Sequence, residues 1–304
     1  MLLSVDHGNY AIKTPFFSFL SGLSEHTSCP PLADELLEYE GRFWTLSGKR
    51  ISYMRDKTQD DRFFILTLFA IARELVRTGS SSPLSQIDLA VGLPPEHYGV
   101  LKDRFANYFK RKDPIRFVYH DRPYMIVINH VLVFPQAYAP VIPNSDLVIK
   151  TARLFLVDIG GYTTDVLLLR YGKPDLQFCR SLESGIITMN NEIIRKVNSL
   201  HDLLIDDEHI SAVLSGQDTI LPSEVQKTIT DATHLHANNI LYQLRELQID
   251  LRSNPVVFIG GGSLLLKPFI VNSPLVAKAE FIDSPSANAQ GYQMLAEAYF
   301  KSIR

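Results

Sequence analysis

Two short segments of the sequence place an aspartate two positions before a glycine, directly after an apolar run. Asp6 and Gly8 follow the run at residues 2–5, and Asp158 and Gly160 follow the run at residues 154–157. Glycine has no Cβ, so the backbone around it can approach an anion closely. The carboxylate does not suit phosphate, but it suits Mg²⁺ or the water molecules around that ion. The pattern therefore predicts two phosphate-binding turns.

A third glycine cluster, residues 260–263 (Gly-Gly-Gly-Ser), follows the apolar run at residues 255–259. A lone Asp-x-Gly is usually an ordinary turn, and a glycine-rich strand end also makes a plain tight turn. The second turn is more specific, because it continues through Gly161 and Tyr162 to Thr163 and Thr164, whose hydroxyls are further donors. The order of the three segments favours nucleotide binding over three unrelated turns.

The segments around these turns predict an alternation of strands and helices. Strands are expected at residues 2–5, 11–20, 87–92, 124–134, 154–157, 166–171 and 255–259, and helices at 60–76, 96–110, 187–200, 222–247 and 289–303. The helix at 60–76 has an apolar face and ends before Gly79. This alternation predicts an α/β fold. Because strand, Asp-x-Gly and strand occur twice, we also expect an internal repeat.

Composition narrows the class of protein. The chain has 304 residues, a formal net charge of −3 and no long basic block, so direct nucleic-acid binding is not expected. Cys29 and Cys179 are too few for a disulfide framework and are expected to be free thiols. The longest apolar run, residues 63–72, is about half of the ~20 residues that span a bilayer. We therefore expect a soluble, cytoplasmic protein without membrane attachment.

The three glycine segments resemble the first phosphate, second phosphate and adenosine motifs of the superfamily of actin, sugar kinases and heat-shock chaperones. Within it, the chain resembles the bacterial actin-like proteins that segregate plasmids, the ParM-like family. Lys13, which closes the first loop, and residues 91–94, 133–136 and 286–291 carry this closer resemblance. It implies a two-lobed actin-like fold, made of duplicated ribonuclease H-like domains with a nucleotide cleft between them. Lobe I would hold residues 1–150 and the helix 286–304, and lobe II residues 151–285.

The resemblance also implies a role for each matching residue. Asp6 and Asp158 would hold the magnesium shell, and Gln136 would orient the attacking water. Many plasmid members have glutamate at this place, and a neutral amide can position water but cannot take its proton. The phosphates would be contacted by Gly8, Asn9, Lys13, Gly160, Gly161, Tyr162 and Thr163, and the adenosine would lie near Gly185, Gly260, Gly261, Gly262 and Ser263.

The function that follows from the resemblance is an ATPase that forms filaments with ATP and disassembles after hydrolysis. Its role would be plasmid or phage DNA segregation through a DNA-binding adaptor protein, and GTP remains open as the nucleotide. A small-molecule kinase of the same superfamily and a non-hydrolysing scaffold or membrane adaptor are the alternatives. The last helix lacks the basic polar face of a membrane-binding helix, which speaks against a membrane adaptor.

Plainer structural roles remain open for several of these residues. His7 is expected to be a turn residue rather than a ligand. Lys13 has the alternative of a solvated strand charge, and Gln136 that of a local cap. Trp44 and Tyr53 are expected to be buried or half-buried core aromatics.

Overall fold

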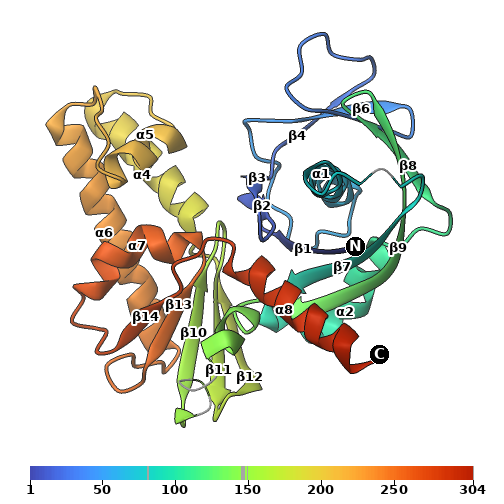
Figure 1. Cartoon of the computed structure of the whole chain (residues 1–304). Coiled ribbons are helices and arrows are strands. Elements are labelled where there is room, and N and C mark those ends of the chain that lie inside the picture. Colours follow the sequence, from blue (N-terminus) through green and yellow to red (C-terminus); the bar gives the residue numbers. More distant parts are fainter. Residues whose placement is uncertain (81, 145–147, 149, 304) are drawn as a thin grey trace. The chain divides into compact units, whose positions relative to one another are not determined.

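The computed structural model describes residues 1–80, 82–144, 148 and 150–303 (Figure 1). The chain divides into two compact units. The first unit holds Met1–Ile142 and Ser286–Arg304, and the second holds Pro143–Pro285. Both units combine helices with a β-sheet, which confirms the predicted α/β class.

The first unit contains a nine-stranded sheet in the order β3-β2-β1-β7-β9-β8-β5-β6-β4. Its strands are β1 (Leu2–His7), β2 (Ala11–Lys13), β3 (Ser18–Leu20), β4 (Leu23–His26), β5 (Leu36–Tyr39), β6 (Arg42–Leu46), β7 (Ser85–Leu93), β8 (Ile115–Tyr119) and β9 (Arg122–Pro135). The pairs β1–β7 and β7–β9 are parallel, and the other pairs are antiparallel. Its helices are α1 (Arg62–Arg77), α2 (Pro95–Tyr108), the 3₁₀-helix η1 (Ala139–Asn144) and α8 (Ala287–Ser302).

Helix α1 is enclosed by this sheet, which curves around it (Figure 1). Every residue from Phe63 to Ala72 is buried. Backbone hydrogen bonds join the segment before β4 to the segment after β6. The amide of Ile51 donates to Ser21 O at 2.8 Å, and the amide of Ser47 donates to Gly22 O at 3.1 Å. A helix that is hydrophobic all round is a buried one. The helix was predicted correctly, but the expectation of one apolar face was too narrow.

The predicted return strand at residues 11–20 is two strands, β2 and β3. Thr14 forms the turn between them, since its Oγ1 accepts from the amides of Phe16 and Phe17 at 3.2 and 3.1 Å. Pro15 has no amide hydrogen to give to a ladder, which explains the break. Strands β4, β5, β6 and β8 were not predicted, because they are short and mix polar with apolar residues.

Helix α8 brings the end of the chain onto strands β1 and β7 of the first unit. Tyr292 of α8 is fully buried and stacks on Phe134 at a ring distance of 6.1 Å. A Cβ at Gly92 would lie only 1.9 Å from the Tyr292 hydroxyl, so this close approach requires glycine. One turn earlier, Asn288 Oδ1 accepts from the amide of Ala137 at 2.9 Å. The helix therefore fixes the backbone just after β9.

The second unit contains a five-stranded sheet in the order β12-β11-β10-β13-β14. Its strands are β10 (Leu154–Ile159), β11 (Thr164–Arg170), β12 (Lys173–Leu182), β13 (Val256–Ile259) and β14 (Ala279–Phe281). Its helices are α4 (Ile186–His201), α5 (Asp207–Leu214), α6 (Ser223–Glu246) and α7 (Gly261–Val271). The predictions of β10, β11, β13, α4 and α6 are confirmed. Helices α5 and α7 and strands β12 and β14 were missed; α7 begins in glycines and contains Pro268, both of which disfavour a helix.

The apolar faces of both units are internal. In the second unit, β10, β11, β13, α4, α6 and α7 share one core, to which Phe155, Met189, Ile240 and Phe258 belong. Both cysteines are free thiols, Cys29 exposed and Cys179 buried. Across the described ranges of the chain, no helix has the length and apolarity to cross a membrane.

The contact between Gly92 and Tyr292 gives a stability prediction. Gly92→Ala should lower the free energy of unfolding by about 1–3 kcal/mol, because the added methyl group forces a buried ring or the strand to move. Gly99→Ala is the matched control in α2, since a Cβ at Gly99 meets no atom within 4 Å. That change should stabilise the helix by about 0.5–1 kcal/mol. Urea denaturation followed by circular dichroism measures both; equal effects of the two substitutions would contradict the close packing of α8.

Candidate functional site

The first turn joins β1 to β2, and protein donors hold its carbonyl groups. The Lys57 ammonium donates to His7 O. Ser21 donates twice, from its hydroxyl to Gly8 O at 2.6 Å and from its amide to Tyr10 O at 2.9 Å. A Cβ at Gly8 would lie 2.6 Å from Ala11 O, so the turn is too tight for any other residue.

These contacts decide where the amides of the turn point. The structure has no cis peptide among its described residues, and a trans peptide directs its N–H opposite to its C=O. The Gly8 amide therefore points away from the Lys57 ammonium, and the Asn9 amide points away from the Ser21 hydroxyl.

The second turn joins β10 to β11 and is held in the same way by a helix. The amides of Ile186 and Ile187, in the first turn of α4, donate to Gly160 O at 3.2 Å and Gly161 O at 2.7 Å. This contact uses amides that a helix leaves without internal partners, at the positive end of its dipole. A Cβ at Gly185 would lie 2.6 Å from Gly161 O, so only glycine lets α4 come this close.

The amides of the second turn differ in what they can offer. Because Gly160 O and Gly161 O are held by α4, the amides of Gly161 and Tyr162 are directed to the opposite side. The amide of Gly160 donates to Thr163 O at 2.8 Å, so Gly160 shapes the turn instead of supplying a donor.

The threonine hydroxyls of this turn donate hydrogen bonds to acceptors within the protein. Thr163 Oγ1 donates to Asp165 Oδ2 at 2.9 Å, and Thr164 Oγ1 donates to Ser184 O at 2.7 Å. The expectation that both hydroxyls add donors for a ligand is therefore wrong, because buried acceptors compete for their protons.

Each turn has a buried aspartate at the end of its first strand. Asp6 lies opposite Lys13 in the β1–β2 ladder, and Asp158 lies opposite Asp165 in the β10–β11 ladder. Directly opposed residues share one face of a sheet, so Asp6 is beside a cation and Asp158 is beside a second carboxylate. Asp165 was not assigned a role from the sequence, although its position mirrors Asp158 across the turn. Like charges this close favour a cation.

Gln136 is oriented by Asp6. Its Nε2 donates to Asp6 Oδ1 at 2.9 Å, and the residue is 9% exposed. A carboxylate only accepts, so the amide nitrogen must face it and Oε1 is the end that remains as an acceptor. The next residue, Ala137, has a φ of 63° and is held by α8, so the backbone here is fixed in a costly conformation. The alternative of Gln136 as a local cap is wrong.

Taken unit by unit, the carboxylates beside each turn suit a magnesium ion that keeps most of its own water. Within the part of the chain that the structure describes, no group of three or more His, Cys, Asp or Glu could enclose a metal. Mg²⁺ is usually held by one or two carboxylates together with water and phosphate oxygens. Asp6, Asp158 and the adjacent Asp165 are carboxylates of this kind.

The third glycine cluster places the start of α7 beside Asp158. Gly260 has a φ of 90°, and a Cβ there would lie 2.3 Å from Asp158 Oδ1. A Cβ at Gly262 would lie 2.6 Å from Ile159 O. The buried Ser263 hydroxyl donates to Ile259 O inside the protein. The cluster therefore allows α7 to reach the second turn, and its role under an adenosine remains a prediction.

His7 is not the turn residue that the sequence suggested. It is the last residue of β1, is fully buried and stacks on Phe109 at 5.1 Å. Thr67 donates its proton to Phe63 O, so its oxygen accepts from His7 Nε2 at 2.8 Å and fixes the neutral tautomer. Burial, and then the Lys57 charge, lowers the pKa of His7 well below its ordinary value. His7 is therefore a neutral, buried ring at the start of the first turn.

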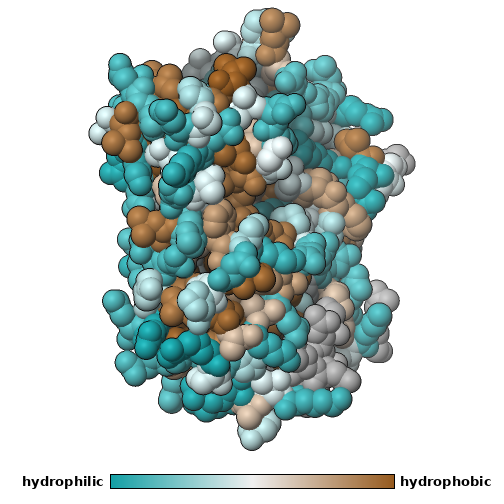
Figure 2. All heavy atoms as spheres, turned by 90° about the vertical axis from the view of Figure 1, so that its left-hand side faces the viewer, coloured by the Kyte–Doolittle hydropathy of each residue, from teal (hydrophilic) through white to brown (hydrophobic). Residues whose placement is uncertain are grey.

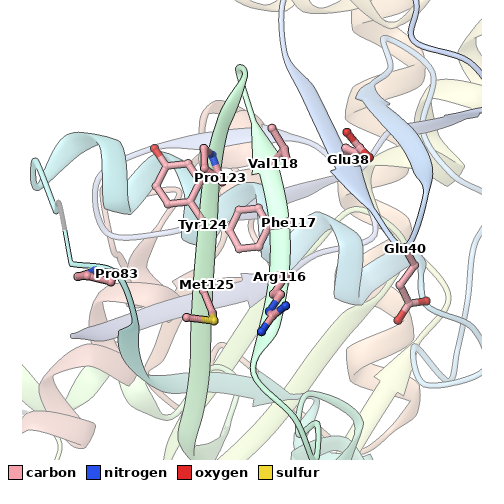
Figure 3. A pocket seen from close by; sticks show the side chains of 9 residues that line it. All are labelled: Glu38, Glu40, Pro83, Arg116, Phe117, Val118, Pro123, Tyr124 and Met125. Atoms are coloured by element: carbon pink, nitrogen blue, oxygen red, sulfur yellow. The ribbon is translucent and has the colours of Figure 1, made fainter.

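A pocket of about 430 Å³ lies on the first unit beside β5, β8 and β9 (Figure 3). Glu38 and Glu40 line it together with the stacked rings of Phe117 and Tyr124. Its carboxylates would repel phosphate, and none of the three glycine segments described above lines it. It is therefore not the candidate site.

Two family models match the chain in separate regions. The model described as actin-like proteins, N-terminal domain, matches residues 39–138. The model described as archaeal actin homologue MreB-like, C-terminal, matches residues 156–272. The chain belongs to the actin-like proteins. The first match lies in the first unit, and the second match lies in the second unit and includes Asp158.

Solved structures share the fold of this actin-like chain over its whole length. The archaeal actin homologue Ta0583 is 19% identical, with a TM-score of 0.77 and coverage of 98% of this chain and 99% of that one. A 15-stranded ParM filament from Clostridium botulinum is 18% identical at a TM-score of 0.76, with the same coverage. Bacillus thuringiensis ParM with ATP is 12% identical at 0.69, covering 100% and 99%. The search of curated proteins finds no match.

The buried neutral His7 gives a pH prediction. Its folded-state pKa lies below the unfolded value of about 6.5, so the unfolded chain takes up the proton first as the pH falls. The stability that neutral His7 contributes is thus present above pH ~6.5 and is lost below it. His7→Gln, which can still donate to Thr67, should reduce the slope of unfolding free energy against pH by up to about 1.4 kcal/mol per pH unit.

Urea denaturation measured from about pH 4.5 to about pH 7.5 covers the range over which the unfolded histidine takes up its proton. His236 in α6 also has its pKa lowered, to about 4, by burial, so a residual slope from the second unit should persist in the variant. A variant with the same slope as the wild type would show that His7 does not titrate differently in the folded state.

Proposed function

We propose that the chain is a nucleoside triphosphatase whose glycine turns bind the phosphate groups of ATP. The observation that carries this proposal is the shared construction of the turns. In each, the carbonyls are held by protein donors and the amides of Gly8, Asn9, Gly161 and Tyr162 are directed away from them. Two unrelated sets of contacts thus direct amides away from held carbonyls, an arrangement that suits binding of phosphate groups.

The chemistry would be hydrolysis by a positioned water molecule. Gln136 Oε1 is the acceptor that would orient that water, while Asp6 fixes the amide by accepting from Nε2. A bound Mg²⁺ would neutralise charge on the phosphates. Asp6 and Asp158 would hold the ion or its waters, with Asp165 beside Asp158. Lys13, opposite Asp6, would add positive charge near the β-phosphate.

We propose further that ATP binding drives head-to-tail polymerisation and that hydrolysis weakens the polymer. The similar chains from Clostridium botulinum and the Alp12 structure are filaments. A contact between two different surfaces of one protein that does not close into a ring gives an open polymer. The second unit exposes large apolar side chains, such as Leu204 and Ile220, that a neighbour in a polymer would cover. Figure 2 shows hydrophobic groups among hydrophilic ones on one face of the molecule.

The cellular role that fits these properties is movement of plasmid or phage DNA in the cytoplasm. With a net charge of −3, the chain would contact DNA through a basic adaptor protein instead of directly. This role follows from the ParM-like resemblance, and the adaptor is expected to bind the filament.

Light scattering tests polymerisation. Scattering should rise when ATP and Mg²⁺ are added above a critical protein concentration and should fall as phosphate is released. ADP is the matched control and should give a smaller rise. Negative-stain microscopy of the same samples identifies filaments. If ATP binds but scattering stays flat at high protein concentration, the polymerisation proposal fails while the nucleotide site stands.

The position of Gln136 predicts a separation of binding from hydrolysis. Gln136→Ala should bind ATP with near-normal affinity but release phosphate about 10- to 100-fold more slowly, because the water is no longer oriented. Its filaments should last longer. Gln217→Ala, at an exposed position of the second unit, is the matched control. Phosphate release at the wild-type rate in Gln136→Ala would contradict the assigned role.

A further inference from the structure

Lys57 lies between β6 and α1, outside all three glycine segments, and yet its ammonium donates to the carbonyl of His7 in the first turn. We propose that Lys57 is a positioning residue for phosphate: it holds the His7–Gly8 peptide so that the Gly8 amide faces the ligand, and it brings a full positive charge to the turn. This inference rests on the proposed nucleotide site and assigns a residue of that site that the motifs do not contain.

The peptide group explains how Lys57 acts at a distance. His7 O and the Gly8 amide belong to one planar trans group, so fixing the oxygen fixes the direction of the N–H. Gly8 itself imposes little preference on the backbone, because glycine is the most permissive residue. Lys57 adds a side-chain donor that favours one orientation of this peptide, in a turn that the β1–β2 ladder and Ser21 also constrain. A charged donor forms a stronger hydrogen bond than a neutral one.

The backbone around Lys57 is fixed on both sides. Asp56 Oδ1 accepts from the amide and hydroxyl of Thr58 at 3.0 and 2.7 Å. Its Oδ2 pairs at 3.0 Å with Arg104 of α2. Burial would raise the pKa of Asp56, but the Thr58 bonds and the Arg104 charge lower it below the ordinary value. The ammonium also lies 5.3 Å from the centre of the Phe63 ring on α1.

Two further contacts join the segment around Lys57 to the same turn. Arg50 lies over the ring of Tyr10 at 5.5 Å. The amide of Ile51 donates to Ser21 O, and the Ser21 hydroxyl holds Gly8 O. Residues 50–57 and the first turn therefore form one connected set of contacts. A change in the conformation of the turn would therefore alter the contacts of this segment, and a change in the segment would alter the contacts of the turn.

Lys57 and Lys13 make different contacts beside the first turn. Lys13 stands opposite Asp6 on the neighbouring strand. Lys57 donates to the neutral carbonyl of His7, within the turn itself. At the second turn, the corresponding donors are uncharged amides of α4. Lys57 thus adds a charged donor to the set that holds the carbonyls of the two turns.

The experiment compares four proteins by calorimetric titration with ATP and, separately, with inorganic tripolyphosphate, each with Mg²⁺. The variants are Lys57→Met, Lys57→Arg and Lys49→Met, an exposed lysine of the same segment that serves as the matched control. Lys57→Met should weaken both ligands about 10- to 100-fold, the range expected for a lost hydrogen bond from a charged group. Lys57→Arg should restore most of the affinity, and Lys49→Met should match the wild type.

Salt dependence separates the charge from simple packing. The affinity of the wild type for tripolyphosphate should fall more steeply with ionic strength than that of Lys57→Met, because one interaction with a full charge is missing in the variant. A variant damaged only in packing would keep the wild-type slope. If Lys57→Met lacks the thermal transition of the wild type, Lys57→Gln takes its place, since it keeps a donor and removes the charge.

The outcomes distinguish this inference from the proposed function. Wild-type affinity for both ligands in Lys57→Met would overturn the role of Lys57 and leave the nucleotide site intact. Equal losses in Lys57→Met and Lys49→Met would overturn it as well. If the wild type binds neither ATP nor tripolyphosphate, the proposed function fails and this inference fails with it.

Discussion

A peptide group carries its acceptor and its donor on opposite sides, so a turn can offer amides to an anion only if its carbonyls are held elsewhere. Both turns of this protein meet that requirement. Lys57 and Ser21 hold the first, and the start of α4 holds the second. Other parts of each unit hold these donors in position. Gly185 lets α4 approach, and the enclosed helix α1 carries the Thr67 and Phe63 contacts beneath His7 and Lys57.

The fold was predictable where a regular pattern coincides with burial. The runs before Asp6 and Asp158 are strands buried on both faces, and the long helices α1, α4 and α6 were found from their periodicity. Strands such as β5 and β6 are short, and their residues become a sheet only because α1 fills the space they surround. Helix α7 was not predicted, because glycines at its start disfavour a helix. Tertiary contact with Asp158 and Ile159 overrides this local preference.

The site was predictable only in part, and for a related reason. The motifs identify the residues that form the turns, because glycine and aspartate are there for local geometry. They do not identify the residues that hold the turns from outside. Lys57 and Ser21 come from segments with no recognisable spacing, and the neutral buried state of His7 depends on rings contributed by α1 and α2. Long-range contacts of this kind leave no periodic trace in a sequence.

The two turns are held by donors of different kinds, and this has a physical consequence. The amides of α4 belong to a 16-residue helix packed in the core of its unit, so the second turn is fixed as firmly as that helix. The first turn is held by the Ser21 amide and by two side chains, one of them a lysine whose four-carbon stem can take several conformations. Holding that lysine in place costs side-chain entropy, which the hydrogen bond to His7 O and the nearby Phe63 ring offset. An anion bound at the Gly8 amide would polarise the His7–Gly8 peptide further and so strengthen the hydrogen bond from Lys57 to His7 O.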